Sequence, residues 1–192
     1  MTPVIWLLGL SGSGKTTLGS LLRLYLEGRG QATTLLDGDR FRREHGFHGF
    51  RPEDRRRNID ALRDAAAREQ ALGRVCIVAA ITPYADMRRK NRELLPRYRE
   101  VWVRCGLATL LQRDTKGLYS AAAQGRVDRL SGVSDAFDAP REAHAVIDTD
   151  RRTLAECYEL LRNLTLDALE GQDETRPALP PARPVLRPCI AL

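Results

Sequence analysis

Short apolar runs alternate with longer helical patterns along the first 170 residues of the chain. The runs that predict strands are Val4–Leu8, Thr33–Leu36, Val75–Ala80, Val101–Cys105 and Ala145–Ile147. They are nearly continuous in apolar residues, which is typical of parallel strands covered on both faces. The segments that predict helices are Lys15–Gly28, Pro52–Leu72, Tyr84–Leu95, Leu107–Arg113 and Arg152–Leu169. This order predicts an α/β fold of three layers, in which helices cover both faces of a doubly wound parallel sheet.

Three segments depart from this alternation. Residues 39–51 are rich in Arg, Gly, His and Phe and show little periodicity, and residues 114–140 are too long for an ordinary connection. Loops of that length in a compact domain are usually functional or disordered. Residues 171–192 carry five prolines, which predicts an extended, disordered tail. We therefore expect one domain over residues 1–170, followed by this tail.

Composition and charge narrow the class of protein. The chain carries 31 basic and 25 acidic residues, a net charge of +6, with acidic residues interspersed among the basic ones. Such mixing is typical of solvated helix surfaces and disfavours a nucleic-acid interface. No apolar run approaches the roughly 20 residues of a membrane span, and the N-terminus lacks the features of a secretory signal. The four cysteines have no C-x-x-C spacing. We therefore expect a cytoplasmic protein with reduced thiols and no metal cage, membrane partner or nucleic-acid partner.

A phosphate-binding loop follows the first predicted strand. Its residues, which match G-x-x-x-x-G-K-[ST] and add one threonine, are Gly9, Leu10, Ser11, Gly12, Ser13, Gly14, Lys15, Thr16 and Thr17. The glycines let backbone N–H groups wrap phosphate oxygens at a helix N-terminus. Lys15 would reach the β- and γ-phosphates, and Thr16 would offer its hydroxyl to Mg²⁺. The loop therefore predicts binding of ATP with Mg²⁺, against the alternative of a glycine-rich turn without a nucleotide.

A phosphate loop alone is compatible with GTPases, ATPase motors and small-molecule kinases. The chain lacks the Asn-Lys-x-Asp guanine signature, and its second predicted strand ends in Asp37-Gly38-Asp39. Ligands bind at the carboxyl edge of open α/β sheets, where a carboxylate can accept a proton from an attacking hydroxyl or hold Mg²⁺ through water. The alternative for these residues is an Asp-Gly turn that caps a helix. Beside the phosphate loop, the aspartate pair favours a kinase.

Arginines and a phenylalanine follow the aspartate pair. Arg42 precedes Gly49-Phe50, and Asp54-Arg55 and Asn58-Ile59 come next. Arginine binds phosphate or sulfate through paired hydrogen bonds, and an aromatic ring offers a face on which a base can stack. Together these residues indicate an anionic acceptor that carries a base.

These motifs, with two more along the chain, resemble those of the adenylylsulfate (APS) kinase family of P-loop kinases over roughly residues 4–150. The shared segments are Gly9–Thr17, Leu36–Asp39 with Arg42, Gly49-Phe50 with Asp54-Arg55 and Asn58-Ile59, Ile81–Tyr84, and Arg113–Tyr119. They correspond to the family patterns G-L-S-G-x-G-K-T-T, L-D-G-D-x-x-R, G-F-x-x-x-D-R-x-x-N-I, I-S-P-Y and R-D-x-K-G-L-Y. Five motifs in the family's order are far more specific than a phosphate loop alone.

The resemblance implies that the chain transfers the γ-phosphate of ATP to the 3′-hydroxyl of APS, which yields PAPS and ADP in sulfate assimilation. It implies catalytic roles for Lys15 and Asp39, support from Asp37, and a role for Arg113 in binding ATP. The residues that it places against the acceptor are Asp39, Arg42, Phe50, Arg55, Asn58, Ile81, Thr82, Lys116 and Leu130. Residues 114–132 would form a mobile lid that excludes water from both nucleotides. A homodimer, with a sulfurylase as a further partner, is also implied.

Three features depart from the family pattern, and one of them is that the segment between Arg42 and Phe50 is a residue shorter than expected. Thr82 stands at the usual serine, so we expect it only to bind the acceptor. Leu130-Ser131-Gly132-Val133-Ser134 stands where the family has F-T-G-[IV]-D. Leu130 would therefore pack on the adenine without aromatic stacking, which would weaken acceptor binding by about 1 kcal/mol.

Two alternatives to this function stay open. One is a paralogous kinase on the same scaffold that phosphorylates another anionic nucleotide. The other is a nucleotide-binding partner subunit without turnover. The presence of Lys15, Thr16 and Asp39 favours an enzyme over such a subunit.

Overall fold

One sheet of five parallel strands organises residues 1–171, which are the residues that the computed structural model of the chain describes. The strands are β1 (Val4–Leu8), β2 (Thr33–Asp37), β3 (Val75–Ala79), β4 (Tyr98–Arg104) and β5 (Ala145–Asp148). Their order across the sheet is β2-β3-β1-β4-β5. Since every neighbouring pair is parallel, the carboxyl ends of the strands meet at one edge of the sheet. The predicted tail lies outside the described residues, apart from Gly171.

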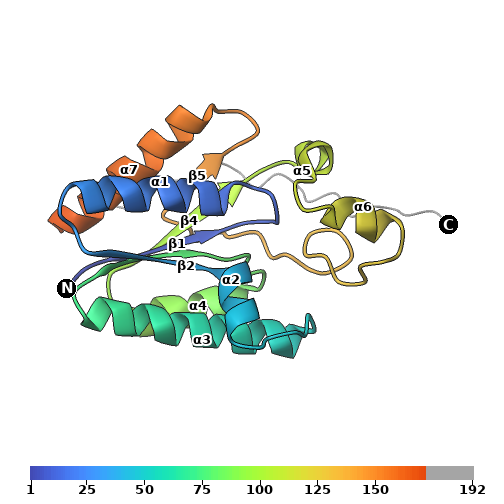
Figure 1. The fold of residues 1–192 in the computed structure, drawn as a ribbon, viewed down its shortest axis with the longest axis horizontal. Helices are drawn as coiled ribbons and strands as arrows, with labels where there is room; N and C mark the ends of the chain where they lie inside the picture. The colour runs from blue at the N-terminus through green and yellow to red at the C-terminus, as the bar shows by residue number, and fades with distance from the viewer. Residues whose placement is uncertain (172–192) are drawn as a thin grey trace.

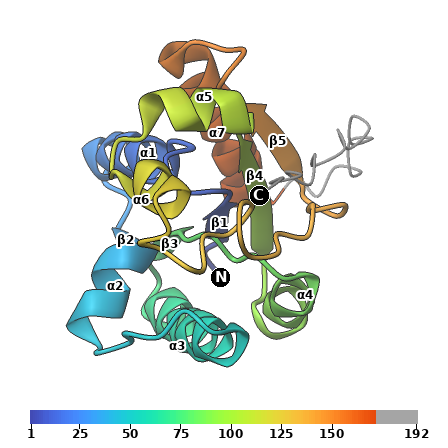
Figure 2. The same ribbon diagram turned by 90° about the vertical axis from the view of Figure 1, so that its right-hand side faces the viewer.

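Helices cover both faces of this sheet, as Figure 1 shows. On one face lie α1 (Lys15–Gly28) and α7 (Leu154–Glu170), and on the other α3 (Pro52–Ala71) and α4 (Ala85–Leu94). Three short helices, α2 (Gly38–Glu44), α5 (Leu107–Arg113) and α6 (Leu118–Ala123), lie at the carboxyl end of the sheet, which faces the viewer in Figure 2. This arrangement confirms the predicted three-layer α/β fold. None of the helices in the described part of the chain is both long and apolar enough to cross a membrane.

The central strand β1 is buried on both sides, and its side chains divide between two apolar clusters. Ile5 and Leu7 pack with side chains of α1 and α7, among them Leu18, Leu22 and Leu161. Val4, Trp6 and Leu8 pack with side chains of α3 and α4, among them Ile59, Leu62 and Met87. Burying a large apolar side chain contributes about 1.5–3 kcal/mol, so alternate residues of one strand stabilise both layers. This explains why the run is apolar at every position.

Most predicted elements coincide with observed ones, and the differences have local causes. The bounds of β1, α1 and α5 are as predicted. β4 begins at Tyr98 instead of Val101, because Tyr98 and Glu100 already pair with β1 although the polar Arg99 and Glu100 interrupt the apolar run. α7 begins at Leu154 after Thr153, whose side chain caps the helix.

Two short helices were predicted as irregular segments. Residues 39–44 belong to α2, whose first turn is capped by the Asp37 carboxylate, and residues 118–123 form α6. Both helices are shorter than two turns, so no helical period of apolar residues can be recognised in their sequences. The capping alternative for Asp37 is thus realised.

Candidate active site

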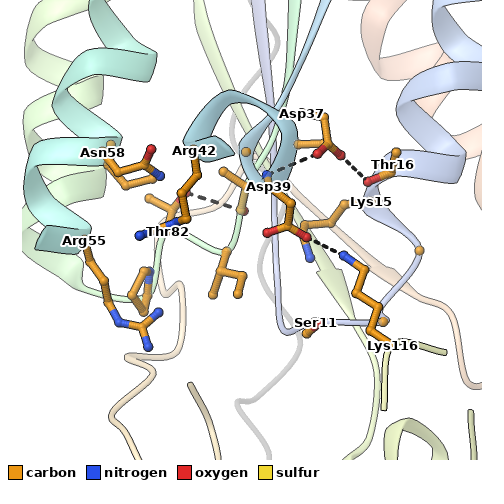
Figure 3. A pocket seen from close by; sticks show the side chains of 18 of the residues that line it. Ser11, Lys15, Thr16, Asp37, Asp39, Arg42, Arg55, Asn58, Thr82 and Lys116 are labelled. Carbon is orange, nitrogen blue, oxygen red and sulfur yellow. Dashed lines mark hydrogen bonds and ion pairs between the residues drawn. The ribbon is translucent and has the colours of Figure 1, made fainter. Parts of the chain in front are cut away.

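A single cavity at the carboxyl edge of the sheet contains most of the predicted site residues. Its walls come from the phosphate loop, α2, the start of α3, the residues after β3, and the segment between α5 and α6. The lining residues are Ser11, Gly12, Gly14, Lys15, Thr16, Thr17, Asp37, Gly38, Asp39, Arg42, Phe50, Arg55, Asn58, Ile59, Ala79, Ala80, Ile81, Thr82, Pro83, Thr115 and Lys116. In Figure 3 the α3 side chains Arg55 and Asn58 stand on one side of this space and Lys15 and Thr16 of α1 on the other, with Asp39 between them.

The phosphate loop has the backbone geometry that its glycines allow. Gly12 and Gly14 adopt φ angles of 76° and 99°, in the left-handed region that favours glycine. A Cβ at Gly9 would lie 2.2 Å from the Val103 carbonyl oxygen of β4, so no other residue fits there. The Lys15 ammonium is buried and donates to the Leu10 carbonyl at 2.8 Å. That burial lowers the pKa of Lys15 to about 8.

Thr16 and Asp37 bring two oxygen ligands together beside the phosphate loop. The Thr16 hydroxyl donates to Asp37 Oδ2 at 2.6 Å, while Asp37 Oδ1 accepts from the backbone N–H groups of Asp39 and Arg40 at 3.1 and 2.9 Å. Mg²⁺ prefers oxygen ligands and is commonly held by one or two protein side chains together with nucleotide phosphates. A hydroxyl and a carboxylate at the mouth of a phosphate loop fit that requirement.

Asp39 faces the cavity from the first turn of α2 and forms an ion pair with Lys116 (Figure 3). Partial burial of this carboxyl opposes ionisation. The hydrogen bond and charge of Lys116, with the charges of Lys15 and Arg42, nevertheless hold the pKa of Asp39 below its usual value. Asp39 is therefore an ionised carboxylate at neutral pH, with a proton-accepting oxygen in the cavity.

The far side of the cavity combines cations, an aromatic ring and an amide. The guanidinium carbons of Arg42 and Arg55 lie 4.7 and 5.7 Å from the centre of the Phe50 ring, which is 51% exposed. Asn58 is only 4% exposed, and its Oδ1 has no hydrogen-bond partner within the protein. An acceptor oxygen left unpaired in a cavity wall calls for a donor on a ligand. These four residues lie together as the sequence predicts.

Asp135 pairs with a residue of this site, although no sequence motif singles it out. Its carboxylate lies 3.2 Å from Arg55 Nε, and both side chains are largely buried. Arg55 also donates to the Arg129 carbonyl at 2.8 Å, so it joins α3 to the segment that follows α6. The sequence holds one hint of its role, because Asp135 comes one position after the segment that stands at the family motif F-T-G-[IV]-D, which ends in aspartate.

The lid segment contacts the phosphate loop directly. The hydroxyl of Tyr119 on α6 donates to the Ser11 carbonyl at 2.8 Å. Lys116 reaches Asp39 from the same segment. The segment around α6 therefore contacts both the phosphate loop and α2 at the edge of the cavity.

Several predicted site residues lie elsewhere or are engaged by the protein itself. The phosphate-loop residues Gly9, Leu10 and Ser13 are not among the residues that line the cavity, and Arg113 donates to the Thr149 carbonyl at 2.8 Å. Ile81 and Thr82 line the cavity, but the Thr82 hydroxyl accepts a hydrogen bond from the Trp6 indole N–H at 2.8 Å. That hydroxyl is therefore held by the core.

Leu130 does not occupy the predicted place against an acceptor base. It is 5% exposed and packs in a small cluster of buried residues with Cys105, Leu110 and Tyr119. This cluster joins the lid segment to α5, so an aliphatic side chain at position 130 fills the interior of the lid. Leu130 is absent from the cavity wall that carries Phe50.

Comparison with known proteins gives one consistent match. The family model for adenylylsulphate kinase matches residues 1–148. The chain is 43% identical over 160 residues to an adenylyl-sulfate kinase of Paraburkholderia xenovorans, which covers 82% of this chain and 89% of that protein. It is 37% identical over 155 residues to a probable bifunctional SAT/APS kinase of Sorangium cellulosum, covering 80% of this chain and 26% of that protein.

A solved structure of an APS kinase is similar as well. The Mycobacterium tuberculosis APS kinase CysC, in complex with AMPPNP and APS, superposes with a TM-score of 0.80 at 28% identity. The match covers 88% of this chain and 98% of the mycobacterial one. With a phosphate loop, a buried lysine and an ionised aspartate arranged around one cavity, the chain belongs to the adenylylsulphate kinase family.

Proposed function

We propose that this protein transfers the γ-phosphate of ATP to the 3′-hydroxyl of adenylyl sulfate. The observation that carries the proposal is the single cavity in which the phosphate loop and Asp39 face the group formed by Arg42, Phe50, Arg55 and Asn58. A donor nucleotide and an anionic, base-containing acceptor can meet there with Asp39 between them. Membership of the adenylylsulphate kinase family supports the choice of acceptor.

The donor half of the cavity binds and neutralises phosphate. Backbone N–H groups of the loop cradle the phosphates, and Lys15 leaves the Leu10 carbonyl to meet the β- and γ-oxygens. Thr16 and Asp37 would hold Mg²⁺, which supplies positive charge to the phosphate oxygens when it is bound. Phosphoryl transfer requires little more than such positioning and charge stabilisation.

The acceptor half orients a hydroxyl and removes its proton. The acceptor oxygen forms a bond to the γ-phosphorus, the bond from that phosphorus to the bridging oxygen breaks, and ADP leaves. The proton of the hydroxyl passes to the Asp39 carboxylate, which Lys116 and Lys15 keep ionised beforehand. Lys116 then meets the charge on the transferred group.

The acceptor itself is held by charge and stacking. Arg42 and Arg55 pair with its phosphate and sulfate oxygens, since guanidinium groups match such anions with two parallel hydrogen bonds. The exposed ring of Phe50 provides a stacking face for the base, and Arg42 has to leave that face when the base arrives.

Assembly and location are further parts of the proposal. The proposal of a cytoplasmic homodimer rests on the family resemblance. A sulfurylase as supplier of the acceptor is supported by the resemblance of this chain to one part of the longer, probable bifunctional SAT/APS kinase of Sorangium cellulosum. Size measurement in solution and co-purification with a sulfurylase test them.

A coupled ADP-release assay with adenylyl sulfate as sole acceptor tests the main proposal. We expect turnover by the natural chain and a loss of about 10²–10⁴-fold in Asp39→Asn with the KM for ATP unchanged, because the amide cannot accept the proton. Turnover only with another anionic nucleotide would assign a different acceptor. No turnover with any nucleotide would make the chain a binding subunit.

A further inference from the structure

The loop after β3 carries backbone strain at the wall of the cavity. Thr82 has a φ angle of 48°, in the left-handed region where a β-branched residue is rarely found. Thr82 and its neighbours Ile81 and Pro83 all line the cavity. A strained residue of this kind persists only when surrounding contacts hold it. The contacts that hold Thr82 are therefore part of how the wall keeps its shape.

Trp6 and Arg88 hold the loop from behind. The indole N–H of Trp6 on β1 donates to Thr82 Oγ1 at 2.8 Å, and Trp6 is fully buried. One terminal nitrogen of Arg88 on α4 donates to the carbonyl oxygens of Thr82 and Pro83 at 3.2 and 3.3 Å. Arg88 is 3% exposed, so its guanidinium faces the loop and the core rather than water.

Glu100 anchors Arg88 from the sheet. Its side chain on β4 is 0% exposed, and Glu100 Oε1 lies 3.7 Å from Arg88 Nε, while Oε2 accepts from Arg92 at 2.9 Å. Such a buried ion pair contributes little net stability compared with well-packed apolar side chains of the same volume. The guanidinium of Arg88 can donate from one terminal nitrogen to both carbonyls of the strained loop while its Nε stays beside Glu100.

We propose that Arg88, held by Glu100, is a positioning residue for the acceptor side of the cavity. It fixes the backbone of residues 82 and 83 and, through it, the wall against which the acceptor lies. The proposal rests on the proposed function for the identity of the acceptor. The phosphate loop depends less on Arg88. Its backbone hydrogen bond to the loop after β3, from the Gly9 N–H to the Ile81 carbonyl, is long at 3.4 Å.

Arg63 provides a matched control for Arg88. It is an arginine of α3 that is buried to a similar degree, and it pairs with Asp60 at 2.7 Å and reaches Asn91. Both arginines therefore lie in the same layer beneath the sheet. Their partners differ, since Arg63 contacts Asp60, Asp64 and Asn91, whereas Arg88 donates to the carbonyls of Thr82 and Pro83.

The experiment compares Arg88→Met with Arg63→Met in thermal stability and in the KM values for adenylyl sulfate and ATP. We expect Arg88→Met to raise the KM for adenylyl sulfate about tenfold or more, since displacement of a site wall by about 1 Å can have effects of that size, and to change the KM for ATP less than threefold. Arg63→Met should lower the melting temperature while both KM values stay within about twofold. Arg88→Lys, which keeps a charge and one donor group, should fall between. A loss of stability in Arg88→Met without a selective rise in the acceptor KM would overturn the proposal.

A spectroscopic measurement keeps the test independent of folding yield and of the acceptor. The chain has two tryptophans, so Trp102→Phe leaves Trp6 as the only indole that emits. In that background we expect Arg88→Lys to shift the Trp6 emission maximum and Arg63→Lys to leave it unchanged. The Trp6 indole N–H is hydrogen-bonded to the Thr82 hydroxyl, and Arg88 contacts the carbonyl of the same residue. Unchanged emission in Arg88→Lys would count against the proposal. If the natural chain does not phosphorylate adenylyl sulfate, the proposed function fails by itself and the emission test still decides the role of Arg88.

Discussion

Lys116 and Asp39 form an ion pair between the lid segment and the first turn of α2, with both side chains about half exposed. In the proposed reaction, the pair joins a basic residue that can approach the transferred phosphate to the carboxylate that would accept the proton. Lys116 contributes the strongest interaction that lowers the pKa of Asp39. The ion pair therefore extends to lower pH the range in which the Asp39 carboxylate is ionised. The segment that carries Lys116 would therefore influence the acid–base chemistry of Asp39 in the proposed reaction.

We expect Lys116→Ala to move the acid limb of the pH profile of kcat/KM to higher pH. Removing the ammonium withdraws a group that lowers the pKa of Asp39, so the carboxylate becomes protonated at a higher pH. The measurement is kcat/KM for the acceptor from acid to neutral pH. Lys90→Ala is the control, because Lys90 pairs with Asp60 on the outer surface at 3.1 Å. An acid limb that stays in place would show that Asp39 does not carry it.

The low pKa of Lys15 predicts that ATP binding weakens as pH rises. Nucleotide phosphates favour the charged ammonium, whose pKa in the free protein is lowered to about 8, so ATP binding above that pH must take up a proton. Calorimetry at several pH values in buffers of different ionisation enthalpy measures both the affinity and the proton uptake. Lys15→Arg keeps its charge over this range and should remove the pH dependence if it still binds ATP. Equal ATP affinity on both sides of pH 8 in the natural chain would contradict the prediction.

The lowered pKa of Lys15 also makes the free energy of unfolding depend on pH. Between about pH 8 and the ordinary value of 10.5, the unfolded chain holds the Lys15 proton and the folded chain does not. The contribution of Lys15 to the free energy of unfolding therefore rises with pH across that interval and is lowest below pH 8, where the ammonium is buried in its charged form. Urea unfolding of the natural chain and of Lys15→Met at pH 7.5 and 9.5 isolates this contribution.

Phe50→Ala should weaken the acceptor and spare the donor. The ring is half exposed and lies on the side of the cavity away from Lys15, and loss of a stacking face reduces binding by about 1–3 kcal/mol. We expect the KM for adenylyl sulfate to rise while the KM for ATP and the melting temperature change little. Leu72→Ala, at another exposed apolar side chain, is the control. A rise confined to the KM for ATP would place Phe50 at the donor.

Leu130→Phe should destabilise the lid and leave acceptor affinity without a gain. The larger ring has to enter the packed cluster around Leu110 and Tyr119, and such overpacking costs about 1–3 kcal/mol. Chemical unfolding and the KM for the acceptor are the measurements. The matched control is Leu111→Phe, since Leu111 is exposed on α5. A several-fold gain in acceptor affinity at unchanged stability would restore the stacking role predicted from sequence.

The sequence predicts best those parts whose signal lies in neighbouring residues. α1 has a buried stripe at Leu18, Leu22 and Leu26, and the loop before it has a fixed pattern, so its position and chemistry follow together. α2 has Phe41 as its one buried large apolar side chain, which leaves no period to detect. Its cap, by contrast, follows from the aspartate before it.

Contacts between distant segments account for what the sequence does not predict. The pairing of Arg55 with Asp135 and the burial of Leu130 depend on how the chain returns after α6, which no local pattern records. The same holds for Thr82, whose hydroxyl is taken up by Trp6 from a neighbouring strand. A family resemblance predicts which residue types lie at the site. The hydrogen-bond and ion-pair partners of each residue depend on how distant segments pack together.

Asp37 divides its two oxygens between the two halves of the cavity. One oxygen accepts from Thr16 in the first turn of α1, and the other caps the first turn of α2, which carries Asp39. Under the proposed function, Thr16 and Asp37 would hold Mg²⁺ on the donor phosphates, and the bond between them would then change while the other Asp37 oxygen still caps α2. In the proposed reaction, Asp37 would therefore couple the donor and acceptor subsites through one side chain. Because such coupling acts equally in both directions, an acceptor that reorients α2 should alter the affinity for the donor by the same factor.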